Sequence, residues 1–192
     1  MPPKAKCTAE QILQAALEIL RTEGSQGLTA RRLAEQLGTS ARPIFTVFSS
    51  MQEVIAGALE LAKERYAGYL DRGLREVPPF KGAGMQHVRF ALDEPVLFRE
   101  IFMSPANAGW GGPDFFLQSR ENYGRVLRSL TDFYGLPVPA AHALYKHLWI
   151  YTHGIASLVA TGVAAADMET VSRQLTEVFS SLVPRYEKGE LT

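Results

Sequence analysis

The segment from Leu28 to Phe48, LTARRLAEQLGTSARPIFTVF, constrains the fold more than any other part of this 192-residue chain. Thr29 is a good N-cap residue, because its hydroxyl can accept a hydrogen bond from a free amide of a first helical turn. The residues from Ala30 to Leu37 place apolar side chains on one helical face. Gly38 then stands where a helix end often requires a positive φ. The segment therefore predicts a short helix that ends in a tight turn.

A second short helix is expected directly after this turn. Ser40 can cap it, and Pro43 is tolerated in its first turn, where the missing amide costs no intrahelical hydrogen bond. Ile44 and Phe48 return to the apolar side one helical turn apart. Two short helices around a glycine-containing turn are typical of a helix-turn-helix, in which the second helix lies in the major groove of DNA.

The rest of the chain also predicts helices, and no segment alternates as a strand would. We expect a first helix from about Thr8 to Thr22, which opens with a capping box of Thr8 and Gln11. A long helix is expected to begin at a second capping box, Ser50 with Glu53, and to end near Arg75. Further helices are predicted at about 81–92, 95–103, 113–134, 139–161 and 167–183, where Asp167 caps the last and Pro184 follows it.

These patterns predict an all-α fold of about nine helices. Residues 1–50 would form a three-helix helix-turn-helix domain, and residues 51–192 would form a larger helical domain. Pro78 and Pro79 interrupt the chain after the long helix, which could therefore join the two domains.

Composition argues against several classes of protein. The chain contains no run of about 18 apolar residues, the length that could span a membrane. The opening MPPKAKC is not followed by the apolar region of a secretory signal. The single cysteine, Cys7, excludes an internal disulfide and fits a reducing compartment, so we expect a cytoplasmic location. We find no nucleophile–base pairing, phosphate loop or cluster of metal ligands, and therefore expect no enzyme, no metal site and no cofactor.

Three segments resemble the TetR family of transcriptional regulators. From Ile12 to Ile55, the shared marks are an Ala-rich first helix, Gly24, Leu28-Thr29, Leu33-Ala34, Leu37-Gly38, Ser40, Phe45, Phe48 and Ser50. LWIYTHGIASLVATG, residues 148–162, is similar to the penultimate helix of a subgroup with a Trp-His-Gly signature. RFALDEPVLFREIFM, residues 89–103, is similar to the middle of the ligand domain of related regulators.

The resemblance implies a homodimer that binds a double-stranded DNA operator through its N-terminal domains. It also implies that the larger bodies pair through their last two helices. A small-molecule effector in each body would alter operator affinity. We therefore expect a repressor that a small apolar or aromatic molecule releases from its operator.

The expected DNA contacts lie in the helix-turn-helix. Arg42 can bond bidentately to guanine, and Ala41 and the methyl group of Thr46 can touch a thymine methyl. The hydroxyls of Thr29 and Ser40 can donate to phosphate. The predicted DNA-binding set is Thr29, Arg31, Ser40, Ala41, Arg42, Phe45 and Thr46.

Two residues depart from the family pattern. The family usually has a tyrosine where this chain has Phe45 and a lysine where it has Met51, and both usual residues resemble phosphate contacts. The departures predict weak non-specific DNA binding, which Lys4, Lys6, Arg31 and Arg32 could partly offset. Together with a formal net charge of zero, they leave a second hypothesis open: an all-helical ligand-binding or interaction protein of the same fold, with weak or lost DNA binding.

Aromatic and histidine side chains between the fifth and eighth predicted helices suit an apolar ligand pocket. The candidates are His87, Phe90, Phe98, Phe102, Trp110, Phe116, Tyr123, Trp149 and His153. The alternative for most of the aromatic residues is that they fill the core.

The last two predicted helices carry long apolar faces, which could pack as a four-helix bundle across a two-fold axis. The candidate dimer interface is Tyr151, Ile155, Leu158, Leu175, Val178, Phe179 and Leu182. The alternative is that these faces form the core of one chain. The dimer is favoured because a helix-turn-helix dimer places its two reading helices about 34–36 Å apart, one turn of DNA.

Overall fold

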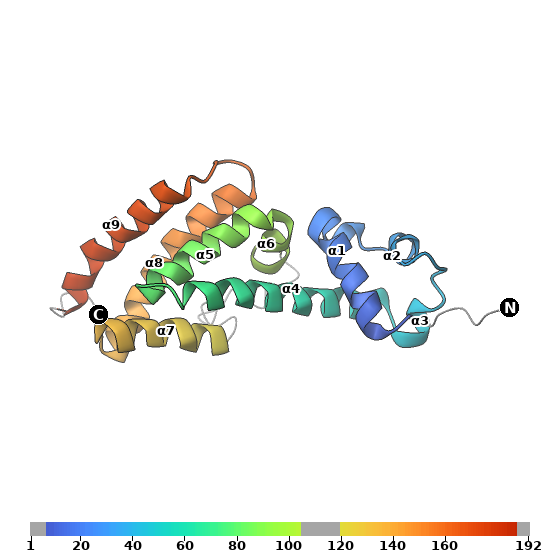
Figure 1. The fold of residues 1–192 in the computed structure, drawn as a ribbon, viewed down its shortest axis with the longest axis horizontal. Helices are drawn as coiled ribbons and strands as arrows, with labels where there is room; N and C mark the ends of the chain where they lie inside the picture. Colours follow the sequence, from blue (N-terminus) through green and yellow to red (C-terminus); the bar gives the residue numbers. More distant parts are fainter. Residues whose placement is uncertain (1–6, 105–119, 188–192) are drawn as a thin grey trace. The chain divides into compact units, whose positions relative to one another are not determined.

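A computed structural model describes residues 7–104 and 120–187 of the chain. All regular structure in these residues is helical, which confirms the predicted all-α fold (Figure 1). The helices are α1 (Ala9–Gly27), α2 (Ala30–Gln36), α3 (Ile44–Val47), α4 (Met51–Gly73), α5 (Pro79–Asp93), α6 (Pro95–Phe102), α7 (Arg120–Tyr134), α8 (Val138–Ala160) and α9 (Met168–Glu187). None of the described helices is both long and apolar enough to cross a membrane.

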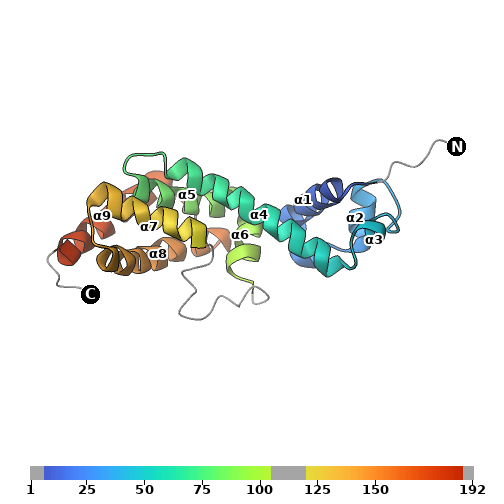
Figure 2. The same ribbon diagram turned by 90° about the horizontal axis from the view of Figure 1, so that it is seen from below.

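The described residues form two compact units. The first unit contains α1 to α3, α4 up to Arg65, and the segment Val96–Met103. The second unit begins at Tyr66 and contains the end of α4, the following residues to Pro95 with all of α5, and α7 to α9. In the second unit α5 packs against α8, and α7 lies beside α8 (Figure 2). The helix α4 thus supplies residues to both units.

The start of α1 agrees with the prediction, but its end does not. Thr8 and Gln11 form the predicted reciprocal capping box. Gly24 departs from helical geometry, with φ of 71° and ψ of −177°, and so interrupts the helix close to the predicted end at Thr22. The helix then resumes as far as Gly27, and just after the interruption the amide of Ser25 donates to the carboxylate of Glu100, 2.8 Å away.

The two short helices of the Leu28–Phe48 segment are present, with one correction. Thr29 caps α2 as predicted, and Gly38 has a positive φ of 64°. Ser40 does not cap α3, which has Pro43 at its N-cap and no capping side chain. A turn through Arg42 and Pro43 precedes the helix instead, in which the carbonyl of Ala41 accepts from the amide of Ile44 at 3.1 Å.

The second predicted capping box is also only half formed. The hydroxyl of Ser50 accepts from the amide of Glu53 at 3.2 Å, as predicted. The carboxylate of Glu53 instead accepts from the amide and hydroxyl of the preceding residue, Ser49, at 2.7 and 2.8 Å. These hydrogen bonds to the charged carboxylate lower the pKa of Glu53.

The core of the second unit joins α4, α5, α7, α8 and α9. Its buried members are Leu70, Ala83, Val126, Leu130, Leu136, Ala141, Leu144, Tyr145, Leu148, Val183 and Tyr186. The predicted end of α9 at Val183 is wrong, since the helix continues through Pro184 to Glu187. Beyond Pro184, Tyr186 is 4% exposed and belongs to the core of the second unit. The start of the helix predicted at 113–134 lies outside the described residues.

The backbones of α4 and α5 approach one another closely at two glycines. A Cβ atom added to Gly73 would collide with the carbonyl of Gly82 and lie 2.7 Å from the amide nitrogen of Ala83. A Cβ atom added to Gly82 would collide with the carbonyl of Gly73 and lie 2.8 Å from the Cβ of Glu76. Glycine at both positions is therefore what permits this helix crossing.

Replacing Gly73 by alanine should destabilise the protein by about 1–3 kcal/mol, because backbone atoms rather than a flexible side chain must move. Gly68→Ala, on the same helix, is the matched control, since its new methyl would meet nothing within 4 Å. The control should be neutral or stabilise by up to about 1 kcal/mol, as expected for alanine in a helix. Thermal unfolding followed by circular dichroism measures the stability of both variants. Equal melting temperatures of the two variants would contradict the close approach of α4 and α5 at Gly73.

Candidate nucleic-acid interface and buried histidine cluster

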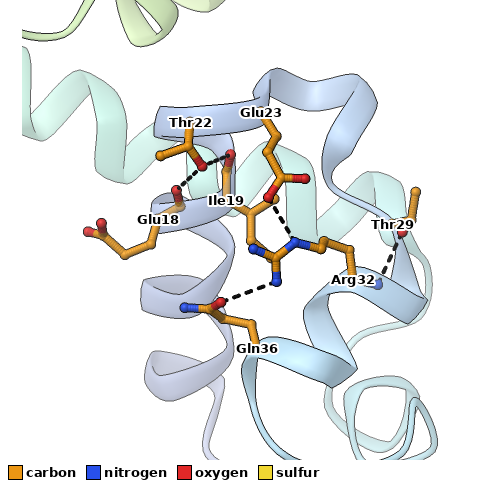
Figure 3. Close-up of polar contacts among 7 residues, drawn as sticks. All are labelled: Glu18, Ile19, Thr22, Glu23, Thr29, Arg32 and Gln36. Atoms are coloured by element: carbon orange, nitrogen blue, oxygen red, sulfur yellow. Dashed lines mark hydrogen bonds and ion pairs between the residues drawn. The ribbon is translucent and has the colours of Figure 1, made fainter.

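A polar clamp fixes α2 against α1 in the first unit (Figure 3). The Nε of Arg32 donates to Glu23 of α1 at 2.8 Å, and its Nη1 donates to Gln36 of α2 at 3.2 Å. The backbone amide of Arg32 donates to the hydroxyl of Thr29 at 3.2 Å. Arg32 therefore ties α2 to α1. An ion pair this exposed contributes about 0.2–1 kcal/mol.

Two buried side chains at α3 set which of the others face outward. Ile44 of α3 is fully buried, and Phe48, the C-cap residue of α3, is 9% exposed. Arg42, Phe45, Thr46 and Val47 are all exposed. The exposed residues therefore form an outward surface, which we call the reading surface and define as Ala41 to Val47 without the buried Ile44.

The predicted DNA-binding residues differ in how far their polar groups are already engaged. The hydroxyl of Thr46 donates to the carbonyl of Pro43 at 2.6 Å, and Arg31 pairs with Glu35 at 3.0 Å. Thr29 accepts from an amide, which leaves its own hydrogen to donate. The side chains of Arg42 and Ser40 have no hydrogen-bond or ion-pair partner among the described residues. Arg42 is thus an exposed cation on the reading surface with its donors unused.

One contact that the sequence did not predict links α6 to α1. The carboxylate of Glu100 accepts from both the amide and the hydroxyl of Ser25, at 2.8 and 3.2 Å. A side chain at Gly24 would lie 2.8 Å from the same oxygen. No local pattern could have indicated the pair, because 75 residues separate its members. The contact shows that α6 is packed with the helix-turn-helix.

The second unit contains a chain of polar rings, in which His87 is buried and the others are half-buried. The hydroxyl of Tyr66 lies 2.8 Å from Nδ1 of His87, and Nε2 of His87 lies 3.2 Å from Nδ1 of His153. Trp149 stacks on His153 with 4.4 Å between ring centroids. Phe90 is fully buried and contacts the ring of Tyr66 at 5.2 Å. We call Tyr66, His87, Trp149 and His153 the histidine cluster.

Burial keeps both histidines uncharged. Desolvation by burial and, to a smaller extent, the neighbouring His153 together lower the pKa of His87 to about 3. Desolvation also lowers the pKa of His153, to about 4. At neutral pH the cluster therefore offers hydrogen-bond donors and acceptors without charge.

The candidate pocket residues fall into separate groups. His87, Phe90, Trp149 and His153 come together at the histidine cluster. Tyr123 contacts other rings, Tyr145 at 5.0 Å and His142 at 5.7 Å. Phe98 and Phe102 contact each other at 4.9 Å in the first unit. Trp110 and Phe116 lie outside the described residues. The part of the chain that the structure describes holds no group of three or more potential metal ligands.

The candidate dimer residues also differ in exposure. Leu158 is 48% exposed, whereas Leu175 is 6% exposed within its own chain. Val178, Phe179 and Leu182 are half-buried and pack against the core of the second unit. Tyr151 and Ile155 are half-buried on α8. Ile150, which the sequence reasoning did not select, is 59% exposed.

The histidine cluster predicts a pH-dependent stability. The histidines of the unfolded chain keep an ordinary pKa near 6.5. Below that pH the unfolded chain therefore binds protons at His87 and His153 that the folded chain does not bind. Stability should be complete above that pH and should fall as the pH drops toward 4, by about 1.4 kcal/mol per pH unit for each histidine. Denaturant unfolding between pH 7 and 4.5 should show a shallower decline for His153→Gln. The exposed His147, on the same helix, is the control: H147Q should keep the decline of the parent protein, and an unchanged decline in H153Q would contradict the assignment.

Comparisons with known proteins agree with this architecture. Residues 12–65 match the family described as bacterial regulatory proteins, tetR family. Residues 80–183 match the Tetracyclin repressor-like, C-terminal domain. No curated protein sequence matches the chain.

One solved structure is similar over nearly the whole fold. It is the crystal structure of a protein from Mesorhizobium loti MAFF303099, described as a TetR-family transcriptional regulator. The match has 17% identity and a TM-score of 0.61, and it covers 93% of this chain and 96% of that one. The matched ranges include the reading surface and three members of the histidine cluster, His87, Trp149 and His153, whereas Tyr66 lies between the two ranges. The chain belongs to the TetR family of bacterial regulatory proteins.

Proposed function

We propose that this chain is a ligand-responsive repressor, which binds a DNA operator as a homodimer and is released by a small apolar or aromatic molecule. The observation that carries the proposal is the reading surface. Its inward residues are buried, and its single cation, Arg42, is exposed with its donors unused. An exposed arginine whose donors are unused can bond bidentately to guanine in the major groove.

The phosphate contacts would come from groups beside the reading surface. The hydroxyls of Thr29 and Ser40 are exposed and can donate to phosphate oxygens, and Arg31 can neutralise charge despite its pairing with Glu35. Phe45 and Met51 offer neither a hydroxyl nor a charge. The salt dependence of binding should therefore be shallow.

The histidine cluster supports an uncharged effector. An apolar site with a few polar groups is usual for a small ligand, and here the polar groups are a phenol, an indole and two neutral imidazoles. A charged effector would find no counter-charge among these four side chains. The effector is thus proposed to be apolar or aromatic with at most neutral polar groups.

Two connections of the chain could carry the response to the effector. The helix α4 runs without a break from the first unit into the second. The segment Val96–Met103 follows α5 directly, yet packs with the helix-turn-helix, where Glu100 holds Ser25. An effector can shift the population of operator-binding states only by its differential affinity for them.

The homodimer would form through an apolar stripe on α8. Ile150, Gly154 and Leu158 are spaced four residues apart and all are exposed. A Cβ atom at Gly154 would meet nothing within 4 Å, so the stripe is unoccupied in the single chain. The exposed positions of α9 are polar, including Arg173 and Glu177. We therefore place the centre of the dimer on α8.

A second candidate function is supported by Phe45 and Met51, which remove two usual phosphate anchors. In this case the protein would bind its ligand or partner without regulating DNA. Selection of bound sequences from a random DNA pool at low salt separates the two functions. Enrichment of a two-half-site sequence supports the repressor, and no enrichment supports the second candidate.

Arg42→Ala should lower affinity for the selected operator by about 10- to 100-fold, as expected for losing one bidentate base contact of about 1–3 kcal/mol. Electrophoretic mobility shifts with selected and random DNA measure the change. Arg173→Ala, which removes the same charge from the exposed face of α9, is the control and should bind as the parent protein does. Equal losses of R42A on both DNAs would show that Arg42 contacts phosphate and not a base.

Ile150→Glu should convert the dimer to monomer, because two charges would be buried across the two-fold axis. Val138→Glu introduces the same charge at a site on the same helix that is 61% exposed, and it should remain dimeric. Sedimentation velocity measures both. A dimeric I150E variant with an unchanged melting temperature would exclude the α8 stripe as the interface.

A further inference from the structure

We infer that each operator half-site contains a guanine flanked by thymines, and that the 5-methyl groups of these thymines are contacted by Phe45 and Thr46. The inference rests on the proposed DNA binding and specifies the base composition that the reading surface can recognise. It follows from three properties of that surface: which side chains point outward, which polar groups are available, and which base edges can use them.

The outward side of the reading surface is centred on Arg42 and Thr46. Arg42 lies in the turn before α3 and Thr46 lies within the helix, and both are exposed. Ile44 and Phe48 are buried. Phe45, 48% exposed, and Val47, 41% exposed, lie on the two flanks. An element that enters the groove with its buried side away from DNA presents these four side chains.

Only one of the four side chains offers hydrogen-bond donors that are free for a base. The Thr46 hydroxyl donates its hydrogen to the carbonyl of Pro43 at 2.6 Å and so has no donor left for a base, and we assign its methyl group as the contact with DNA. Phe45 and Val47 carry no polar atom. Arg42 supplies the donors, and none of them is used by another described residue.

This inventory selects among the four base pairs. Adenine is usually read by Asn or Gln and cytosine by Asp or Glu, and the stretch ARPIFTV from Ala41 to Val47 contains none of these. Guanine presents two acceptors that fit the fork of an arginine, and thymine presents a methyl group that fits apolar contacts. The polar contact is thus assigned to guanine and the apolar contacts to thymine.

The position of Phe45 extends the apolar contact. In place of a hydroxyl that would bond to phosphate, the ring offers a large apolar surface beside Thr46. A thymine methyl packed between the ring and the Thr46 methyl would lose contact with water on both sides. Contact with each methyl group should be worth about a fourfold change in affinity, on the basis of the free energy of burying one such group.

The first test uses the intact protein and the operator recovered from the random pool. Each thymine of a half-site is replaced in turn by deoxyuridine, which removes the 5-methyl group and leaves the base-pairing edge unchanged. We expect about a fourfold loss of affinity at one or two thymines next to the guanine, and no loss at thymines outside the half-site. Replacing that guanine by 7-deazaguanine, which lacks the N7 acceptor, should weaken binding by more than any single loss of a methyl group.

The second test separates the methyl group of Thr46 from its hydroxyl. Thr46→Val keeps the methyl and removes the hydroxyl, and it should retain operator affinity within twofold. Thr46→Ser keeps the hydroxyl and removes the methyl. The T46S variant should bind thymine DNA about fourfold more weakly than the parent protein does. On the matching deoxyuridine DNA the two proteins should bind equally well. Phe45→Ala should likewise weaken binding to thymine DNA but not to deoxyuridine DNA, because the methyl group that the ring would contact is absent from deoxyuridine.

The outcomes distinguish the inference from the proposed function. The inference would be overturned if the operator still bound tightly with all its thymines replaced by deoxyuridine and if T46S and T46V had equal operator affinity. These results would leave the proposed repressor function intact. Failure to enrich any sequence would overturn both. Circular dichroism melts confirm that each variant is folded at the assay temperature, so that a loss of binding can be assigned to the removed group.

Discussion

The burial of Ile44 and Phe48 is the constraint on which the reading surface depends. A helix of four residues has too few internal hydrogen bonds to be stable alone, so packing must hold it. That packing fixes the rotation of α3 and leaves Arg42 and Thr46 facing outward. The clamp from Arg32 to Glu23 and Gln36 holds the preceding helix in place. The reading surface is thus a product of the core beneath it.

The histidine cluster shows the same dependence of chemistry on packing. Histidine ordinarily titrates near neutral pH, but burial among aromatic rings lowers the pKa of His87 and His153 to about 3 and 4. The residues also meet in an order that spacing along the chain does not indicate, since Tyr66, His87 and His153 belong to three different helices. Uncharged imidazoles suit a neutral ligand, and this links the electrostatics of the body to the proposed effector.

The segment Val96–Met103 illustrates why sequence patterns assign helices better than they assign neighbours. An apolar helix at 95–103 was predictable, and α6 forms there. Its place beside α1 was not, because it depends on one carboxylate from Glu100 reaching an interrupted helix at Ser25. Local periodicity shows that a face must be buried, but several partners could bury it. Phe98 and Phe102 were grouped with the ligand pocket for this reason, and they pack in the first unit.

The sequence by itself determined the all-α fold, the caps at Thr8, Thr29 and Asp167, and the glycine turn at Gly38, since each is fixed by residues within a turn or two of chain. It also determined which side chains of the reading surface carry donors. Only the tertiary structure decided that Glu100 reaches Ser25, that Gly73 and Gly82 meet, and that Leu175 is buried while Ile150 is exposed. These features depend on which helix surfaces approach each other, and that choice is made by packing the whole chain.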